Sequence, residues 1–290
     1  MQPKTWIGDF IMATQPPANA ALPLLYQGLE PLNSGQHGAM KLKRGQTIPN
    51  VGQVHAIPVT IDEFIHAQRT YPIIFSAGDQ PIPLALMGLN EGVNTFIDAN
   101  GMPIDQNAYM PAYLRRYPFL LAKLRPDSDE LSLCFDPNSG SVAEDGEDAL
   151  FEGDQPSELT RNILAFCEQF ETAGQRTHAF MQEVLKLDVL MDGEVSIQPE
   201  GAQQPFLYRG FRMVDEEKLR NLRGDELRKI NQNGVLSLLF AHLFSLGLIR
   251  DLFYRQVQQG KGPQGLVLPD VGGGAARGQG TSKAKDDAQA

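Results

Sequence analysis

The sequence predicts an α+β fold, with a mainly antiparallel sheet in the N-terminal half packed with helices from the C-terminal half. Short apolar runs bounded by Pro, Gly, Asn and Asp fill residues 54–135, a pattern that is typical of strands joined by tight turns. Apolar residues at helical spacing fill residues 157–254. Residues 259–290 have almost nothing to bury, and because such a segment cannot offset its ordering entropy we expect a disordered C-terminal tail.

The first predicted helix spans residues 61–68, where Thr60 is a suitable N-cap and Glu63 follows as in a capping box. Tyr71-Pro72 ends it, because the residue before a proline is pushed out of the helical region. Three short strands are then predicted, over residues 73–75, 84–89 and 94–98. Asn100-Gly101 closes the last of them with a hairpin signal.

A second copy of this pattern follows the first. A helical turn over residues 112–116 precedes Tyr117-Pro118, and apolar strands are predicted over 119–121 and 131–135. We interpret the Tyr-Pro steps at Tyr71 and Tyr117 as two related helix-to-strand units in one sheet. Chance similarity is the alternative.

Helices dominate the C-terminal half. Ser157 is the predicted N-cap of a long amphipathic helix that Gly174 kinks or splits. Residues 195–197 and 206–208 form a hairpin that completes the sheet. Further helices are expected after Asp215 and after Asp225, and over residues 235–254.

The chain divides into three predicted regions. Residues 1–50, rich in Pro, Gly, Asn and Gln, are expected to form an irregular N-terminal arm. Residues 51–258 form one α+β domain, and residues 259–290 form the tail. A split into two subdomains near residue 150, within the acidic stretch 136–156, is the alternative.

The chain is acidic, with a formal net charge of −10 over 290 residues. Because phosphate binding needs clustered Lys and Arg, this charge predicts no nucleic-acid partner, and it disfavours docking on anionic lipid. The longest apolar stretch, residues 235–249, is shorter than the roughly 20 residues of a membrane span, so no transmembrane segment is predicted. Because the N-terminus lacks a signal peptide, we expect a cytoplasmic protein, with the cell surface reached by a non-classical export route as the alternative.

No catalytic residue, metal site or cofactor is predicted. The sequence contains no zinc-protease, phosphate-loop or nucleophile-elbow motif. Cys134 and Cys167 lie among apolar neighbours and are expected to be inert buried thiols. His242 lies in the most apolar helix and is predicted to be a hydrogen-bonded core or interface residue rather than a catalytic base.

The candidate ligand-binding residues are the arginines and tyrosines around the two Tyr-Pro steps. These residues are Arg69, Tyr71, Arg115, Arg116 and Tyr117. A few convergent polar groups in a concave pocket are typical of a small-molecule site. The alternative is structural, with each guanidinium stacked on a tyrosine or paired with a carboxylate.

The sequence resembles the SapC family of bacterial proteins over residues 54–250. The segments that carry the resemblance in the first half are 71–76 (YPIIFS), 83–89 (PLALMGL), 94–98 (NTFID), 110–119 (MPAYLRRYPF) and 133–136 (LCFD). In the second half they are 176–180 (RTHAF), 210–219 (GFRMVDEEKL) and 241–246 (AHLFSL).

The resemblance implies an association with a paracrystalline bacterial surface layer, and it assigns no catalytic residue. Three hypotheses for the function follow. The first is a non-catalytic accessory or interaction protein with a protein partner that the sequence does not identify. The second is a structural component associated with the surface layer. The third is an enzyme or small-molecule binder that uses the Arg/Tyr pocket.

Overall fold

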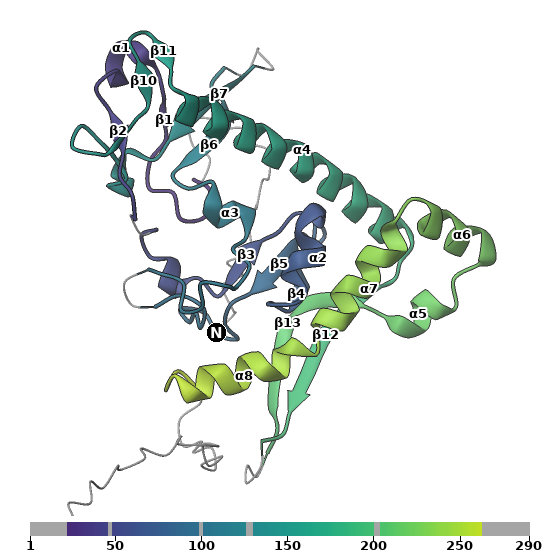
Figure 1. The fold of residues 1–290 in the computed structure, drawn as a ribbon. Coiled ribbons are helices and arrows are strands. Elements are labelled where there is room, and N and C mark those ends of the chain that lie inside the picture. Colours follow the sequence, from purple (N-terminus) through teal and green to yellow (C-terminus); the bar gives the residue numbers. More distant parts are fainter. Residues whose placement is uncertain (1–21, 46–47, 99–100, 126–129, 200–203, 263–290) are drawn as a thin grey trace, which may run out of the picture.

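The fold is α+β, as the sequence predicts, with antiparallel sheets followed by C-terminal helices (Figure 1). The computed structural model describes residues 22–45, 48–98, 101–125, 130–199 and 204–262. The predicted tail beyond residue 262 and the first 21 residues of the predicted arm lie outside the described residues.

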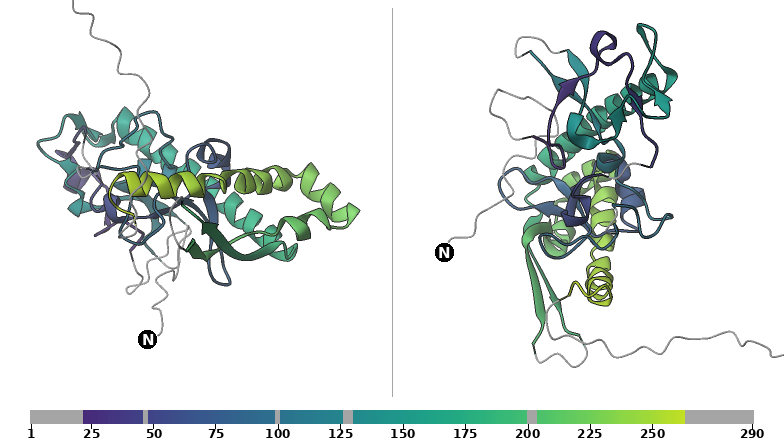
Figure 2. Two further views of the ribbon diagram at one scale, coloured as in Figure 1. Left: turned by 90° about the horizontal axis from the view of Figure 1, so that it is seen from below. Right: turned by 90° about the vertical axis from the view of Figure 1, so that its left-hand side faces the viewer.

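The larger sheet has five antiparallel strands that come from both halves of the chain. In spatial order they are β12 (Leu190–Ile197), β13 (Phe206–Val214), β4 (Ile73–Ser76), β5 (Pro83–Leu86) and β3 (Ala56–Pro58). The β12–β13 hairpin joins the sheet where Phe211 pairs with Ser76 and Arg212 pairs with Phe75. The predicted hairpin therefore completes the sheet, and its far end projects beyond the other strands (Figures 1 and 2).

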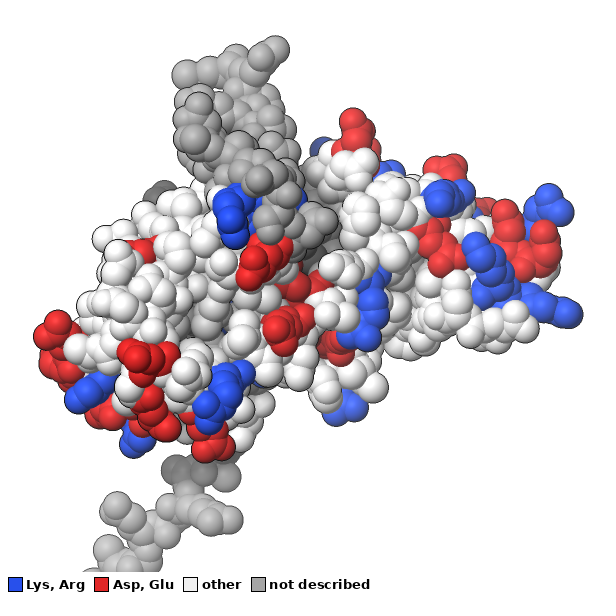
Figure 3. All heavy atoms as spheres, turned by 90° about the horizontal axis from the view of Figure 1, so that it is seen from above, with Lys and Arg blue, Asp and Glu red and all other residues white. Residues whose placement is uncertain are grey.

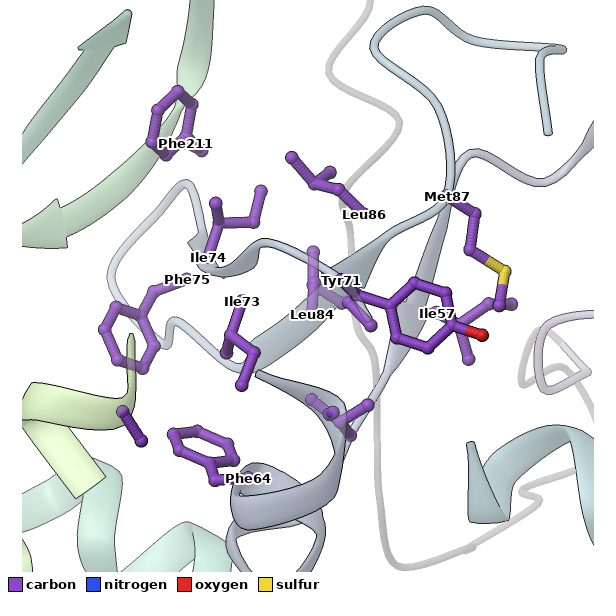
Figure 4. Packing of buried hydrophobic residues seen from close by; sticks show 14 of the residues in the cluster. Ile57, Phe64, Tyr71, Ile73, Ile74, Phe75, Leu84, Leu86, Met87 and Phe211 are labelled. Atoms are coloured by element: carbon purple, nitrogen blue, oxygen red, sulfur yellow. The ribbon is translucent and has the colours of Figure 1, made fainter. Parts of the chain in front are cut away.

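The main hydrophobic core surrounds β4 and β5 (Figure 4). Ile73, Phe75 and Leu86 are fully buried. Phe64, from the short helix α2 (Phe64–Ala67), lies on the side of Ile73 and Phe75, and Leu86 points to the opposite side. The 3-10 turn η2 (Ile61–Glu63) leads into α2, and Thr60 and Glu63 form the predicted capping box. Because both faces of these strands are covered, their sequences are continuous apolar runs and do not alternate between apolar and polar residues.

The second sheet has three antiparallel strands, in the order β1 (Glu30–Pro31), β7 (Leu131–Phe135) and β6 (Phe119–Lys123). Strand β6 is buried on both faces: Phe119 and Leu121 pack in one apolar cluster, and Leu120 and Ala122 pack in another. The short helix α3 (Ala112–Arg115) precedes it, as α2 precedes β4.

The two Tyr-Pro units therefore lie in different sheets, and the prediction of one shared sheet is wrong. Strand β4 pairs with β5 and β13, whereas β6 pairs with β7. Each strand takes the next strand along the chain as its hairpin partner, so the local pattern repeats without placing the two copies side by side.

The predicted third strand over residues 94–98 is also wrong. The structure has only an isolated bridge there, between Ile97 and Pro103, and Asn100 of the expected hairpin lies outside the described residues. The buried Asn94 side chain accepts hydrogen bonds from the backbone N–H groups of Phe96 and Ile97. These local bonds replace the ladder bonds that a strand would make.

The acidic stretch 136–156 contains short ordered elements. They are the 3-10 turn η3 (Pro137–Ser139) and the strands β8 (Val142–Ala143), β9 (Asp148–Ala149), β10 (Phe151–Glu152) and β11 (Gln155–Pro156). Strands β8 and β9 flank β2 (Lys41–Leu42), and β10 pairs with β11. Two further elements of the N-terminal region are α1 (Ser34–His37) and η1 (Val51–Gln53).

Helix α4 (Glu158–Lys186) is the longest element and runs past both sheets (Figure 1). Ser157 accepts a hydrogen bond from the Thr160 N–H and is the N-cap, as predicted. The predicted break at Gly174 is wrong, because the helix runs unbroken through this buried glycine.

Four helices complete the described chain: α5 (Glu216–Arg220), α6 (Gly224–Gln232), α7 (Val235–Ser245) and α8 (Leu248–Gln258). Asp215 caps α5 as predicted, whereas Asp225 lies in the first turn of α6 and Arg223 is its N-cap. The helix predicted over residues 235–254 is two helices, α7 and α8. By length and composition alone, the stretch Val235–Gln258 is apolar enough to cross a membrane.

Candidate functional site

The structure separates the five predicted site residues into two groups. Arg69 and Tyr71 follow α2, where the Arg69 side chain is exposed and Tyr71 is buried in the main core. The Tyr71 hydroxyl donates a hydrogen bond to the carbonyl oxygen of Tyr109 at 2.5 Å. Arg115, Arg116 and Tyr117, at the end of α3, line one cavity together.

This cavity, which we call the α3–α4 cavity, has a volume of about 350 Å³ and lies between α3, β6, β2 and the first turns of α4. Its lining comprises Leu42, Lys43, Gly45, Arg115, Arg116, Tyr117, Pro118, Phe119, Ser141, Asn162, Ile163 and Phe166. The lining includes three cationic side chains and, among the residues that the structure describes, no carboxylate.

Arg116 is held in the floor of the cavity by aromatic rings. The residue is 6% exposed, and the guanidinium carbon lies 4.3 Å from the ring centre of Phe170 and 4.5 Å from that of Tyr113. Nη1 lies 3.5 Å from Oε1 of Glu171. The Nε of Arg116 and the Oε1 of Glu171 have no hydrogen-bond partner among the described residues.

Burial dominates the electrostatics of Glu171. Loss of solvent raises the pKa of its carboxyl to about 7, although the nearby Arg116 guanidinium opposes that rise. The ion pair therefore recovers only part of the cost of burying the carboxylate. Near neutral pH, protonated and ionised Glu171 are both populated.

Arg115 differs from Arg116 in having no ion pair with any described carboxylate. Its Nε donates a hydrogen bond to the carbonyl oxygen of Met110 at 3.0 Å. Its guanidinium carbon lies 5.1 Å from the ring centre of Phe166, which also lines the cavity. Its Nη2 also donates to the Tyr109 hydroxyl at 3.4 Å, so the side chain is oriented by two hydrogen bonds and by stacking, while its other N–H donors remain available.

Tyr117 is a hydrogen-bond donor at the cavity wall. Its hydroxyl donates to Oδ2 of the buried Asp136 at 3.2 Å, and the same oxygen accepts the backbone N–H of Gln27 at 2.8 Å. Burial, together with the Asp136 carboxylate, raises the pKa of the Tyr117 phenol above its usual range. The phenol therefore stays protonated at neutral pH and does not serve as a base.

Glu63 joins the two Tyr-Pro units, and the sequence indicated only its capping role. Oε2 accepts the backbone N–H of Thr60 at 2.8 Å. Oε1 accepts the backbone N–H of Ala112 at 2.6 Å and the hydroxyl of Tyr109 at 2.9 Å. One buried carboxylate therefore caps η2 and also holds the start of α3.

The two cysteines lie in apolar surroundings. Burial raises the pKa of Cys134 to about 11 and that of Cys167 to about 12. Because the thiolate is the reactive form, neither thiol is activated for nucleophilic attack at neutral pH. Within the described ranges, no group of three or more His, Cys, Asp or Glu side chains is placed to hold a metal ion.

A second feature is the outer face of α7, which we call the α7 face and define by Phe240 and Phe244. Their side chains are 41% and 74% exposed, and the two rings stack with centroids 5.7 Å apart. Helix α7 carries no Lys, Arg, Asp or Glu. Figure 3 shows charged side chains of both signs clustered at the two ends of one face of the molecule, with further charged groups scattered between them.

Comparison with known proteins gives one match. The sequence model of the SapC family matches residues 32–252, a range that includes the α3–α4 cavity and the α7 face. No curated protein and no solved structure matches the chain.

Proposed function

The chain belongs to the SapC family, and from this premise and the α7 face we propose that it is a non-catalytic interaction protein that binds an apolar surface of a partner protein. The observation that carries the proposal is the exposure of Phe240 and Phe244 on a helix without charges. Exposed aromatic groups of this kind are typical of interaction sites, where buried aromatic anchors supply much of the binding energy.

The inner side of α7 is fixed to the sheet, so its outer side is available for a partner. Val235 and Leu239 are buried in the main core, and the His242 and Ser245 side chains bond to the backbone of the sheet. The neighbouring Phe240 and Phe244 point away from this contact, as their exposure indicates. An amphipathic arrangement with i and i+4 anchors suits a hydrophobic groove on another protein.

Charge favours a different protein over a second copy or a bilayer. The net charge of −10 makes two copies repel each other, and it opposes adsorption to anionic lipid. Insertion of the stretch Val235–Gln258 into a membrane would also break the bonds that His242 and Ser245 make with the sheet. An uncharged α7 face selects a partner by its apolar surface rather than by its charge.

The buried polar side chains support a binding role over a catalytic one. Both nitrogens of His242 are occupied by backbone groups, and both oxygens of Glu63 accept hydrogen bonds. The Tyr117 phenol and both thiols are held protonated at neutral pH. These groups therefore stabilise the fold.

The test is quantitative co-purification from the native host with the variant F240S/F244S and the control variant L131S. Leu131 is an exposed apolar residue on β7, outside the α7 face. The proposal expects one protein in fixed stoichiometry with the wild type and with L131S, and its loss with F240S/F244S. Retention of the protein by F240S/F244S would contradict the proposal, as would binding of the wild type only to itself or to lipid vesicles.

A further inference from the structure

We propose that the α3–α4 cavity binds a small organic acid, with its carboxylate paired to Arg115 and its apolar body against Phe166 and Ile163. The cavity is separate from the α7 face, because it adjoins the first turns of α4, whereas α7 packs against β4 and β13. This inference therefore stands or falls independently of the partner protein proposed above.

The charge balance of the cavity leaves room for one negative charge. Lys43 forms an ion pair with Asp145 at 2.9 Å, and Arg116 faces Glu171 at 3.5 Å. Arg115, an exposed residue whose Nη2 also donates to the Tyr109 hydroxyl at 3.4 Å, is the cation of the lining without a carboxylate partner among the described residues. A monoanion supplies the missing counter-charge, and a carboxylate fits the planar fork of a guanidinium with two parallel hydrogen bonds.

Arg116 adds a second observation that points to an anion. It lines the cavity and is more than nine-tenths buried, yet its Nε donates to no described acceptor. Buried donors without partners are costly, so most native structures satisfy them. Arg116 therefore adds positive charge near a carboxylate bound to Arg115 rather than a direct bond from Nε, because that atom has no accessible surface and consecutive residues of α3 point in different directions.

The walls of the cavity favour an organic acid over an inorganic anion. Phe119, Ile163 and Phe166 present apolar surface, while Ser141 and Asn162 present a hydroxyl and an amide. The volume of about 350 Å³ lies in the range of small-ligand pockets, which are mostly apolar with a few polar groups that orient the ligand. Inorganic phosphate would leave the apolar walls in contact with water.

The experiment is isothermal titration of the full chain with phenylacetate, its neutral analogue phenylacetamide, and inorganic phosphate. We expect saturable binding of phenylacetate at millimolar concentration or below. The other two probes should bind at least about tenfold more weakly, because phenylacetamide loses the charge-assisted hydrogen bond and phosphate loses the apolar contact.

Three variants locate the site. R115Q removes the proposed carboxylate partner, and N162D places a negative charge in the lining with little change of shape. Each is expected to weaken phenylacetate binding at least about tenfold while the thermal unfolding temperature stays that of the wild type. R69Q is the matched control, because Arg69 is exposed and does not line the cavity, and it should bind as the wild type does.

Four outcomes would overturn the inference: no saturable binding of phenylacetate, equal binding of phenylacetamide, preferential binding of phosphate, or wild-type affinity in both R115Q and N162D. Loss of binding in R69Q would equally place the anion elsewhere. None of these results depends on whether the α7 face binds a protein, so the two proposals are tested separately.

Discussion

His242 on α7 donates its Nδ1–H to the carbonyl oxygen of Ile73 on β4 at 2.8 Å, and its Nε2 accepts the backbone N–H of Val214 on β13 at 3.1 Å. The imidazole is therefore neutral, with its proton on Nδ1, because Val214 can only donate. Ser245, one turn further along α7, accepts the backbone N–H of Ile73 at 2.8 Å. Two side chains of one helix thus fix α7 to the centre of the larger sheet.

The hydrogen bonds of the neutral His242 predict that acid lowers the stability of the fold. Burial lowers the pKa of His242 to about 4, below its ordinary value of 6.5, so the unfolded chain binds a proton in this range that the folded chain does not. The contribution of His242 to the free energy of unfolding should therefore fall as the pH drops from 6.5 toward 4, by about 3 kcal/mol in total and about 2 kcal/mol between pH 7 and pH 5, whereas Glu171 contributes a change of opposite sign between pH 7 and pH 5.

Urea unfolding at pH 7 and pH 5 checks this expectation. Because Glu171 titrates in the same interval with the opposite effect, the comparison is made in the E171Q background: H242Q/E171Q should lose most of the pH dependence that E171Q shows and be less stable at pH 7, because buried backbone groups lose a partner. The control variant H178Q changes an exposed histidine and should behave as the wild type does. An equal pH slope in E171Q and H242Q/E171Q would show that His242 is not the group that titrates.

Glu171 should change the free energy of unfolding with pH in the opposite direction from His242. Its folded pKa of about 7 lies above the ordinary 4.5, so the folded chain holds the extra proton and stability falls as the pH rises through that interval. E171Q should therefore match the wild type near pH 5 and exceed its stability at pH 8 by about 2 kcal/mol. Unfolding of both proteins at the two pH values measures the difference.

Replacement of Arg116, the partner of Glu171, should lower the stability instead of raising it. R116M leaves the carboxylate of Glu171, which is 8% exposed, without its counter-ion, so the loss at pH 8 should be about 3 kcal/mol or more. The double variant R116M/E171Q should recover much of that loss. If R116M alone were neutral at pH 8, the account of this pair would be wrong.

Glu63 should be the most sensitive carboxylate of the first half. E63A leaves the buried backbone N–H of Ala112 and that of Thr60 without acceptors, which should lower the free energy of unfolding by about 2 to 4 kcal/mol. The control variant E91A changes an exposed carboxylate and should lie within about 0.5 kcal/mol of the wild type. Equal stabilities of E63A and E91A would refute the linking role of Glu63.

Gly88 is predicted to tolerate no side chain. A Cβ at this position would lie 1.9 Å from the carbonyl oxygen of Val93, a backbone atom that cannot move away cheaply. G88A should therefore destabilise the protein by more than about 2 kcal/mol. G224A is the matched control, because a Cβ there meets nothing within 4 Å, and its unfolding temperature should equal or exceed that of the wild type.

The sequence predicted the features that depend on neighbouring residues. The capping box of Thr60 and Glu63, the caps Ser157 and Asp215, and the strands after each Tyr-Pro step all follow from interactions within a few positions. It failed where a distant partner decides the structure. Which sheet takes β4 or β6 depends on pairing with β13 or β7, and two similar local patterns carry no information about that choice.

The candidate site shows the same division. Arg115, Arg116 and Tyr117 are neighbours in sequence, and their shared cavity follows from the geometry of α3. Lys43, Ser141 and Asn162 reach it from elements far along the chain, so no local pattern could include them. The prediction that Arg69 and Tyr71 belong with these residues rests on the analogy between the two Tyr-Pro units, and that analogy does not hold because the units lie in different sheets.

Site-specific photocrosslinking in the native host measures whether the α7 face contacts a partner protein. A photoreactive phenylalanine analogue is placed at position 244, and at position 131 as the control. We predict one discrete protein adduct from position 244. The control should not form it, and excess wild-type protein, but not F240S/F244S, should compete it away. Equal adducts from both positions, or adducts from position 244 only with lipid or with a second copy of the chain, would contradict this prediction.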